Sequence, residues 1–210
     1  MIHLKQVDKY YDQKLILNIA ELKLESGIYW INGINGSGKT TLLKILAGII
    51  PFNGDITIND VSLKKEPVEY RKLVSYTEAE PLYPSFITGI DLVSFYQDIR
   101  KAPGLQVDKL IAFSGLRQDL DHPIGTYSSG MVKRLSLLLA FIGHVSLIIL
   151  DEPLATLDAE AVHALPDLIK EYRLEYGTSF IFSSHQPFLA GTCLTHRELE
   201  ISGQTIHSSL

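Results

Sequence analysis

The sequence contains a single cysteine, Cys193, so an internal disulfide cannot form. A chain without disulfides fits a reducing compartment such as the cytoplasm. No basic group stands beside Cys193 in the sequence. We therefore interpret it as a small packed residue rather than as a nucleophile.

Long hydrophobic runs are also missing. The longest uncharged segment, residues 135–150, is interrupted by Gly143 and His144. It is shorter than the roughly 18 apolar residues that indicate a membrane span. Residues 1–5 show neither the basic nor the apolar region of a signal peptide. We expect a soluble chain, in which residues 135–150 form a buried helix followed by a buried strand.

An excess of positive charge is absent as well. Lysine and arginine number 19 against 24 acidic residues, and the formal net charge is -5. This balance argues against a nucleic-acid partner. Charged residues at 20% and hydrophobic residues at 46% are typical of a globular chain. The mean hydropathy of +0.12 still leaves room for an apolar docking surface.

Residues 33–41, Gly-Ile-Asn-Gly-Ser-Gly-Lys-Thr-Thr, fit the phosphate-loop pattern G-x-x-x-x-G-K-[ST]. An apolar run at 28–31 predicts a strand before the loop, and the spacing from Leu42 predicts a helix after it. Glycines let successive N–H groups curl around phosphate oxygens, and the helix N-terminus adds partial positive charge. An ordinary glycine-rich turn would not require the Lys-Thr pair. The residues that we expect to bind the nucleotide are Asn35, Gly36, Ser37, Gly38, Lys39, Thr40 and Thr41.

Two acids, Asp151 and Glu152, end the apolar run 147–150. A carboxylate at such a strand end can lie beside a phosphate loop and hold Mg²⁺ through water. A second carboxylate at the next position can polarise the attacking water. We predict that Thr40 and Asp151 are the metal ligands and that Glu152 is the base. The alternative is a solvated turn before Pro153.

Hydrophobic patterning predicts an α/β fold around this loop. Strands are expected at 2–7, 14–24, 27–32, 73–76, 147–150 and 179–182, with two short ones near 197–207. Residues 54–63 are expected to form a strand and a turn. Helices are expected at 39–48, 88–100, 107–114, 129–142 and 159–176. The pattern predicts a P-loop NTPase fold with a mixed sheet and antiparallel N-terminal strands. We expect one domain over 1–210, in which a helical subdomain at about 81–141 is inserted between 1–80 and 142–210.

Taken in order, these motifs resemble the ATP-binding subunit of an ABC (ATP-binding cassette) transporter over nearly the whole chain. Residues 33–41 match Walker A, and residues 150–153 match Walker B with its catalytic glutamate. Four further matches are the adenine-stacking aromatic at Tyr11, the signature at 127–131 with Ser128, Ser129 and Gly130, the D-loop at Asp158, and the switch histidine at His185.

Each of these four matches is weak by itself. Tyr11 offers a π-face for stacking, yet a lone tyrosine after a strand is commonly a packing residue. Ser128 could hold a γ-phosphate or could only cap a helix. His185 could contact phosphate, although a lone histidine after a strand is usually structural.

The resemblance implies two ATP molecules held between two such subunits in a head-to-tail homodimer or heterodimer. The signature of one subunit would face the phosphate loop of the other, with Asp158 communicating across the interface. Glu152 would activate water, and His185 would contact the γ-phosphate. The dimer would drive a membrane-spanning partner from the cytoplasmic face of the membrane, using ATP and Mg²⁺.

The sequence departs from the family at two places. Alignment puts Ala79 where the family has a glutamine, and alanine has no oxygen for Mg²⁺ or water. Glu78 or Glu80 could substitute, or both could be solvated loop residues. Tyr127, Ser129 and Met131 replace the family's signature residues. We therefore expect ATP binding to be intact and hydrolysis to be slow, or to depend on the partner.

Two other functions remain open from the sequence. One is a regulatory or non-transport ATP-binding module that hydrolyses little. The other is a small-molecule kinase sharing only the phosphate loop, which Glu152 and Asp158 argue against. The short length and residues 184–187 also resemble compact bacterial exporter subunits, including the haem-exporter type. This resemblance does not assign a substrate.

Overall fold

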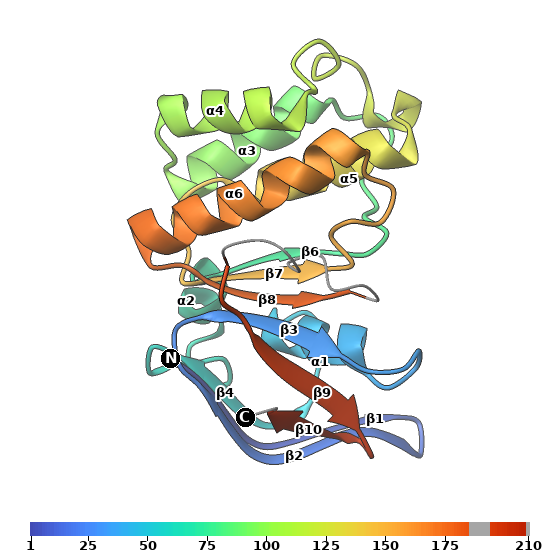
Figure 1. The fold of residues 1–210 in the computed structure, drawn as a ribbon, viewed down its shortest axis with the longest axis vertical. Helices are drawn as coiled ribbons and strands as arrows, with labels where there is room; N and C mark the ends of the chain where they lie inside the picture. Colours follow the sequence, from blue (N-terminus) through green and yellow to red (C-terminus); the bar gives the residue numbers. More distant parts are fainter. Residues whose placement is uncertain (185–193, 209–210) are drawn as a thin grey trace.

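The computed structural model describes residues 1–184 and 194–208. Its central feature is a six-stranded sheet of order β10-β9-β3-β8-β7-β6 (Figure 1). The strands from β9 to β6 run parallel to their neighbours, and β10 is antiparallel to β9. The strands are β3 (Ile28–Asn32), β6 (Val74–Thr77), β7 (Leu147–Asp151), β8 (Ser179–Ser183), β9 (Arg197–Ser202) and β10 (Thr205–Ser208).

A second sheet is antiparallel and has the order β2-β1-β4-β5. Its members are β1 (Ile2–Tyr11), β2 (Lys14–Leu24), β4 (Asn53–Ile58) and β5 (Val61–Ser62). In β1, residues 2, 4 and 7 are buried. This sheet therefore has one face turned to the core and one to solvent.

Helices occupy two layers around the large sheet (Figure 1). α3 (Gly89–Arg100), α4 (Gly104–Ser114), α5 (Ser129–Phe141) and α6 (Ala159–Tyr176) lie on one side of it. α1 (Lys39–Leu46) lies on the other side, between the two sheets, and α2 (Pro67–Lys72) lies near it. None of the helices in the described part of the chain combines the length and apolar composition needed to cross a bilayer.

Alternation along β7 divides the core into two halves. Ile148 and Leu150 pack in a cluster with apolar residues of α5 and α6. Leu147 and Ile149 pack in the other cluster, with α1 and the four-stranded sheet. β7 is buried at every position because both faces of a central parallel strand are covered. Its C-terminal end is therefore fixed from both sides.

The fold class expected from the sequence is confirmed, and some details differ. The strand and turn expected over 54–63 are a hairpin of two strands, β4 and β5. α2 was not predicted, because it has six residues and only Tyr70 among them is buried, so no apolar period develops. α4 begins at Gly104 rather than near 107, directly after Pro103. Proline is well tolerated there, since an N-terminal helix position needs no N–H partner.

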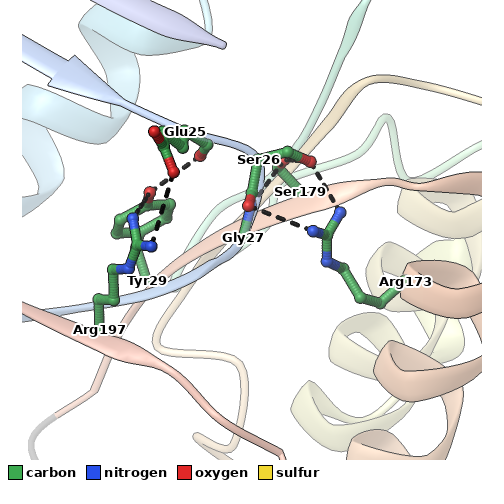
Figure 2. A network of polar contacts seen from close by, with 7 residues as sticks. All are labelled: Glu25, Ser26, Gly27, Tyr29, Arg173, Ser179 and Arg197. Atoms are coloured by element: carbon green, nitrogen blue, oxygen red, sulfur yellow. Dashed lines mark hydrogen bonds and ion pairs between the residues drawn. The ribbon is translucent and has the colours of Figure 1, made fainter.

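A polar network fixes the end of the sheet opposite the strand C-termini (Figure 2). Arg173 of α6 donates to Ser26 Oγ at 2.7 Å, to the Gly177 carbonyl at 2.9 Å and to the Ser26 carbonyl at 3.2 Å. Ser179 Oγ accepts from the Gly27 N–H at 3.2 Å. A second set of contacts ties β9 to the same turn, through Glu25, Tyr29 and Arg197.

Replacing Arg173 with alanine is expected to lower the free energy of unfolding by about 1–2 kcal/mol, because hydrogen bonds from a charged donor are lost. For a chain of this size, Tm falls by about 2–4 °C per kcal/mol. Thermal unfolding checks this, with exposed Lys170→Ala on the same helix as the control. Equal Tm values for the two variants would show that the network adds no stability.

Candidate nucleotide site

The phosphate loop joins the end of β3 to the start of α1. Gly36 has a φ of 78° and Gly38 a φ of 108°, so both occupy the left-handed region that favours glycine. Gly33 is needed for a different reason. A Cβ there would lie 2.7 Å from Ser37 Oγ and 2.9 Å from the Ile201 carbonyl oxygen. The glycines of the pattern therefore allow both the backbone turn and its close packing.

Two polar side chains of this loop lie inside it. Lys39 is buried, and its Nζ donates to the carbonyls of Gly33 at 2.7 Å and Ile34 at 3.2 Å. Ser37 Oγ is also buried and has no hydrogen-bond partner within the described residues. Thr40 follows at the first turn of α1 and is exposed. A buried ammonium, an unsatisfied hydroxyl and a helix N-terminus together suit a phosphate chain.

A cleft of about 330 Å³ lies beside the loop. It is lined by β2, by the loop and by the turn between β9 and β10, through Lys14, Ile16, Ile34, Gly36, Ser37 and Gln204. Tyr11 pairs with Lys14 across the β1–β2 hairpin. Its side chain is 47% exposed, and the Lys9 ammonium lies 4.7 Å from the ring centroid. Tyr11 is therefore the cross-strand neighbour of Lys14, which lines this cleft, and its ring is accessible for stacking on a base.

The two acids at the end of β7 are organised by Ser183 of β8. The Ser183 hydroxyl donates to Asp151 Oδ1 at 2.5 Å and accepts from the Glu152 N–H at 3.1 Å. Tyr76 OH lies 3.4 Å from Asp151 Oδ2. The backbone leaves the strand at Glu152, whose φ of 44° is rare for a residue with a Cβ. Asp151 is therefore held on Oδ1 by a short hydrogen bond and on Oδ2 by a long one, and Glu152 lies in a strained turn.

Strand register places the loop and the acids at one edge of the sheet. Ser183 of β8 is level with Ile31 of β3 on one side and with Asp151 of β7 on the other. Neighbouring strands are about 4.8 Å apart, so β3 and β7 are separated by about 10 Å. Ligands of such sheets bind outside the C-terminal ends of the strands. The predicted loop and acids are thus brought together.

In the segment after β6, Glu78 contacts lysines of two helices. The Glu78 carboxylate pairs with Lys44 of α1 at 3.3 Å. The Glu78 carbonyl accepts from Lys133 of α5 at 2.7 Å. Burial lowers the pKa of the Lys133 ammonium to about 8, while Asp151 and Glu152 act in the opposite direction. Sequence reasoning identified neither lysine.

The residues of the predicted signature begin α5. Ser128 is its N-cap, and the hydroxyl oxygen accepts from the Met131 N–H at 3.2 Å. Its O–H proton remains a possible donor to a phosphate oxygen. Ser128 and Ser129 are exposed, whereas the Tyr127 hydroxyl donates to the Asp119 carbonyl at 2.7 Å. Tyr127 is therefore a packing residue with a satisfied hydroxyl.

Asp158 lies next to this helix start within the same chain. It caps α6 by accepting from the Ala161 N–H at 3.0 Å and forms an ion pair with Arg134 of α5. A Cβ on Gly130 would lie 3.0 Å from the Thr156 carbonyl oxygen, so the start of α5 packs closely on this segment. Within the described part of the chain, no hydrogen bond joins residues 128–130 to the phosphate loop. His185 lies outside the described residues.

A glycine loop between a parallel strand and a helix, with a buried strand-end aspartate at the same edge, defines a P-loop nucleotide-binding protein. Comparison with known proteins narrows this class. The chain belongs to the ABC transporter family, whose family model matches residues 17–155. Within that family it is an ATP-binding ATPase subunit.

Its relatives include ATP-binding subunits of several systems. It is 31% identical to the cytochrome c biogenesis ATP-binding export protein CcmA of Legionella pneumophila, covering 84% of this chain and 88% of that one. It is 32% identical to the spermidine/putrescine import ATP-binding protein PotA of Fusobacterium nucleatum, covering 88% of this chain and 50% of that one.

Solved structures show the same fold. An ATP-binding subunit of an ABC transporter aligns with a TM-score of 0.89 at 21% identity, covering all of this chain and 89% of that one. The dimeric, post-hydrolysis ATP-binding cassette MJ0796, bound to ADP and Pi, aligns with a TM-score of 0.85 at 18% identity. That alignment covers all of this chain and 98% of the other.

Proposed function

We propose that this subunit hydrolyses ATP within a closed dimer and that the movement drives a membrane-spanning partner. The alignment of the phosphate loop with the Ser183–Asp151–Glu152 unit at one sheet edge carries this proposal. This edge of the sheet then holds hydrogen-bond donors for phosphate, a carboxylate oxygen that could bind a metal ion, and a candidate base. Together these are the parts that phosphoryl transfer to water requires.

The nucleotide would lie in the phosphate loop, held by residues 35–41, with its base stacked on the accessible ring of Tyr11. Lys39 would exchange the Gly33 and Ile34 carbonyls for phosphate oxygens, and Ser37 Oγ would gain a partner. Thr40 and Asp151 offer the hard oxygen ligands that Mg²⁺ prefers. The bound ion would neutralise developing charge on the phosphates. Ser183 fixes Asp151 Oδ1, and Oδ2, whose hydrogen bond from Tyr76 is long at 3.4 Å, would bind the ion or its water.

Glu152 is the proposed base for the attacking water. It follows the strand that carries Asp151, and its main-chain N–H is held by Ser183. A carboxylate at this point can accept a proton from water while Asp151 serves the metal. We propose that His185 completes the site by contacting the γ-phosphate.

The exposed start of α5 supports a role across a dimer interface. Ser128, Ser129 and Gly130 would meet the γ-phosphate held by a second subunit, either a copy of this chain or a related one. The Ser128 O–H and the helix N-terminus supply the donors. Asp158 is paired with Arg134 of α5 and would couple the conformations of the two ATP sites across the dimer interface. The dimeric state of one structural neighbour supports this arrangement.

A groove beside the helical layer, lined by aromatic, aliphatic and charged side chains, supports a docked partner. It measures about 370 Å³ and is lined by Tyr76, Pro81, Leu82, Tyr83 and Tyr96, among others. Leu82 is 90% exposed, and Phe86 nearby in the chain is 82% exposed. We propose that residues 81–141 form the helical subdomain of the single domain. The membrane-spanning subunit would dock at this groove from the cytoplasmic side of the membrane.

ATP-dependent dimerisation tests the proposal. Glu152→Gln with ATP and Mg²⁺ is expected to elute as a dimer and without ATP as a monomer, as measured by size-exclusion chromatography with light scattering. Adding Ser128→Arg to Glu152→Gln should restore the monomer, because a long charged side chain would block the phosphate-facing helix start. The control is the double variant Glu152→Gln with Lys65→Met, because Lys65 is exposed in the loop between β5 and α2. A monomer under all conditions would contradict the dimer mechanism.

A regulatory module with weak hydrolysis is the second candidate. Ala79 supplies no side-chain oxygen, and the Glu78 carboxylate is already paired with Lys44. Tyr127 and Met131 also pack inward instead of offering polar groups. The steady-state turnover of the isolated chain, compared with its turnover in the presence of its membrane partner, separates the two candidates.

A further inference from the structure

Lys133 of α5 is almost completely buried, with 1% of its surface exposed. Its Nζ donates to three main-chain carbonyls: Glu78 at 2.7 Å, Asp151 at 2.9 Å and Ala79 at 3.2 Å. An ammonium has three N–H donors, so each of them has a partner. Burial of an ammonium is costly unless it is fully hydrogen-bonded. This geometry meets that requirement using backbone oxygens alone.

The Asp151 carbonyl belongs to the peptide unit that joins the two acids. Lys133 holds this unit at its carbonyl oxygen, and Ser183 holds the same unit at the Glu152 N–H. The peptide is thus fixed from α5 on one side and from β8 on the other. Glu152 has a φ of 44°. A non-glycine residue in such a conformation costs about 1–3 kcal/mol and persists only where its surroundings impose it.

We propose that Lys133 is a positioning residue for ATP hydrolysis, which sets the direction of Glu152 through the 151–152 peptide. It also fixes the Glu78–Ala79 backbone against the same peptide. The backbone of this segment is therefore anchored although Ala79 offers no side-chain group. Lys133 lies one helical turn from Ser129, so the anchor belongs to the helix that begins with the proposed signature.

This inference rests on the proposed role of Glu152 and predicts a specific kinetic signature. Lys133→Met keeps the stem and removes all three donors. We expect kcat to fall about 10- to 100-fold, because small displacements of a catalytic group carry costs of this size. Kd for ATP and KM should stay within about twofold, since Lys133 contacts backbone rather than nucleotide. Exposed Lys170→Met on α6 is the matched control.

Stability and a second substitution separate positioning from folding. Turnover is normalised to the ATP sites titrated with a fluorescent nucleotide, and Tm is measured for each variant. Lys133→Gln retains two N–H donors and is expected to recover part of kcat relative to Lys133→Met. Normalised turnover equal to wild type in Lys133→Met would overturn the proposal, even if Tm falls. So would equal normalised turnover in the Gln and Met variants.

A double substitution distinguishes this inference from the proposed function itself. In the Glu152→Gln background, Lys133→Met is expected to cause no further loss of turnover, because residues that act as one unit are non-additive. Multiplicative losses would overturn positioning through Glu152. If Glu152→Gln lowers turnover while Lys133→Met does not, the proposed function stands and the Lys133 inference fails. If Glu152→Gln has no effect, the assignment of the base fails first.

Discussion

Glu152→Gln is expected to lower kcat for ATP hydrolysis by about 10²- to 10⁴-fold, the usual contribution of a positioned general base. The amide keeps the size of the carboxylate but cannot accept the proton of the attacking water. The main-chain contact from the Glu152 N–H to Ser183 does not depend on the side chain, so the turn should persist. Steady-state release of phosphate measures the loss, and ATP affinity is expected to change by less than about threefold.

The matched control is Glu175→Gln, the same substitution at an exposed position near the end of α6. It removes one negative charge far from the strand C-termini and should leave kcat at the wild-type value. Equal turnover in wild type and Glu152→Gln would remove Glu152 from catalysis. Loss of ATP affinity together with turnover would instead assign Glu152 to binding.

The parts of the site that the sequence predicts are those encoded within a few consecutive residues. Gly36, Gly38 and Lys39 specify the loop locally, because positive φ and a helix start need particular residues at fixed spacing. An apolar run ending in Asp151 likewise marks a strand end. Parallel strands that share a sheet bring their C-terminal ends to one edge, which joins these two signals.

The contacts that organise the acids could not be predicted in this way. Ser183 reaches Asp151 only through the pairing of β8 with β7, and register between distant strands has no local signal. Nor does spacing reveal the Arg134–Asp158 pair, since it depends on how α5 packs against the start of α6.

Lys133 did leave a signal in the sequence. Residues 133 and 137 share one face of a helix, and Leu137 is buried, so a lysine at 133 is aligned with the core face of α5. A lysine at a buried position needs hydrogen-bond acceptors. The pattern therefore indicates a paired internal ammonium, but it cannot identify the three carbonyls. Two of them come from the segment after β6 and one from the end of β7.

Lys39→Met is expected to weaken ATP binding about 10- to 100-fold. Hydrogen bonds from a charged donor contribute about 1.5–3 kcal/mol, and each 1.4 kcal/mol is a factor of ten in Kd. Methionine keeps most of the buried stem volume, so the packing of α1 should be retained. Titration with a fluorescent ATP analogue and calorimetry measure Kd.

Lys65→Met removes the same charge at an exposed position and serves as the control. Lys39 also bridges the Gly33 and Ile34 carbonyls, so its loss could loosen the loop instead of removing a phosphate contact. Nucleotides of different length separate these effects. Because the ammonium is proposed to reach the β- and γ-phosphates, AMP affinity should be unchanged while ATP affinity falls. A uniform loss for ATP, ADP and AMP would mean that Lys39 supports the loop and not the phosphates.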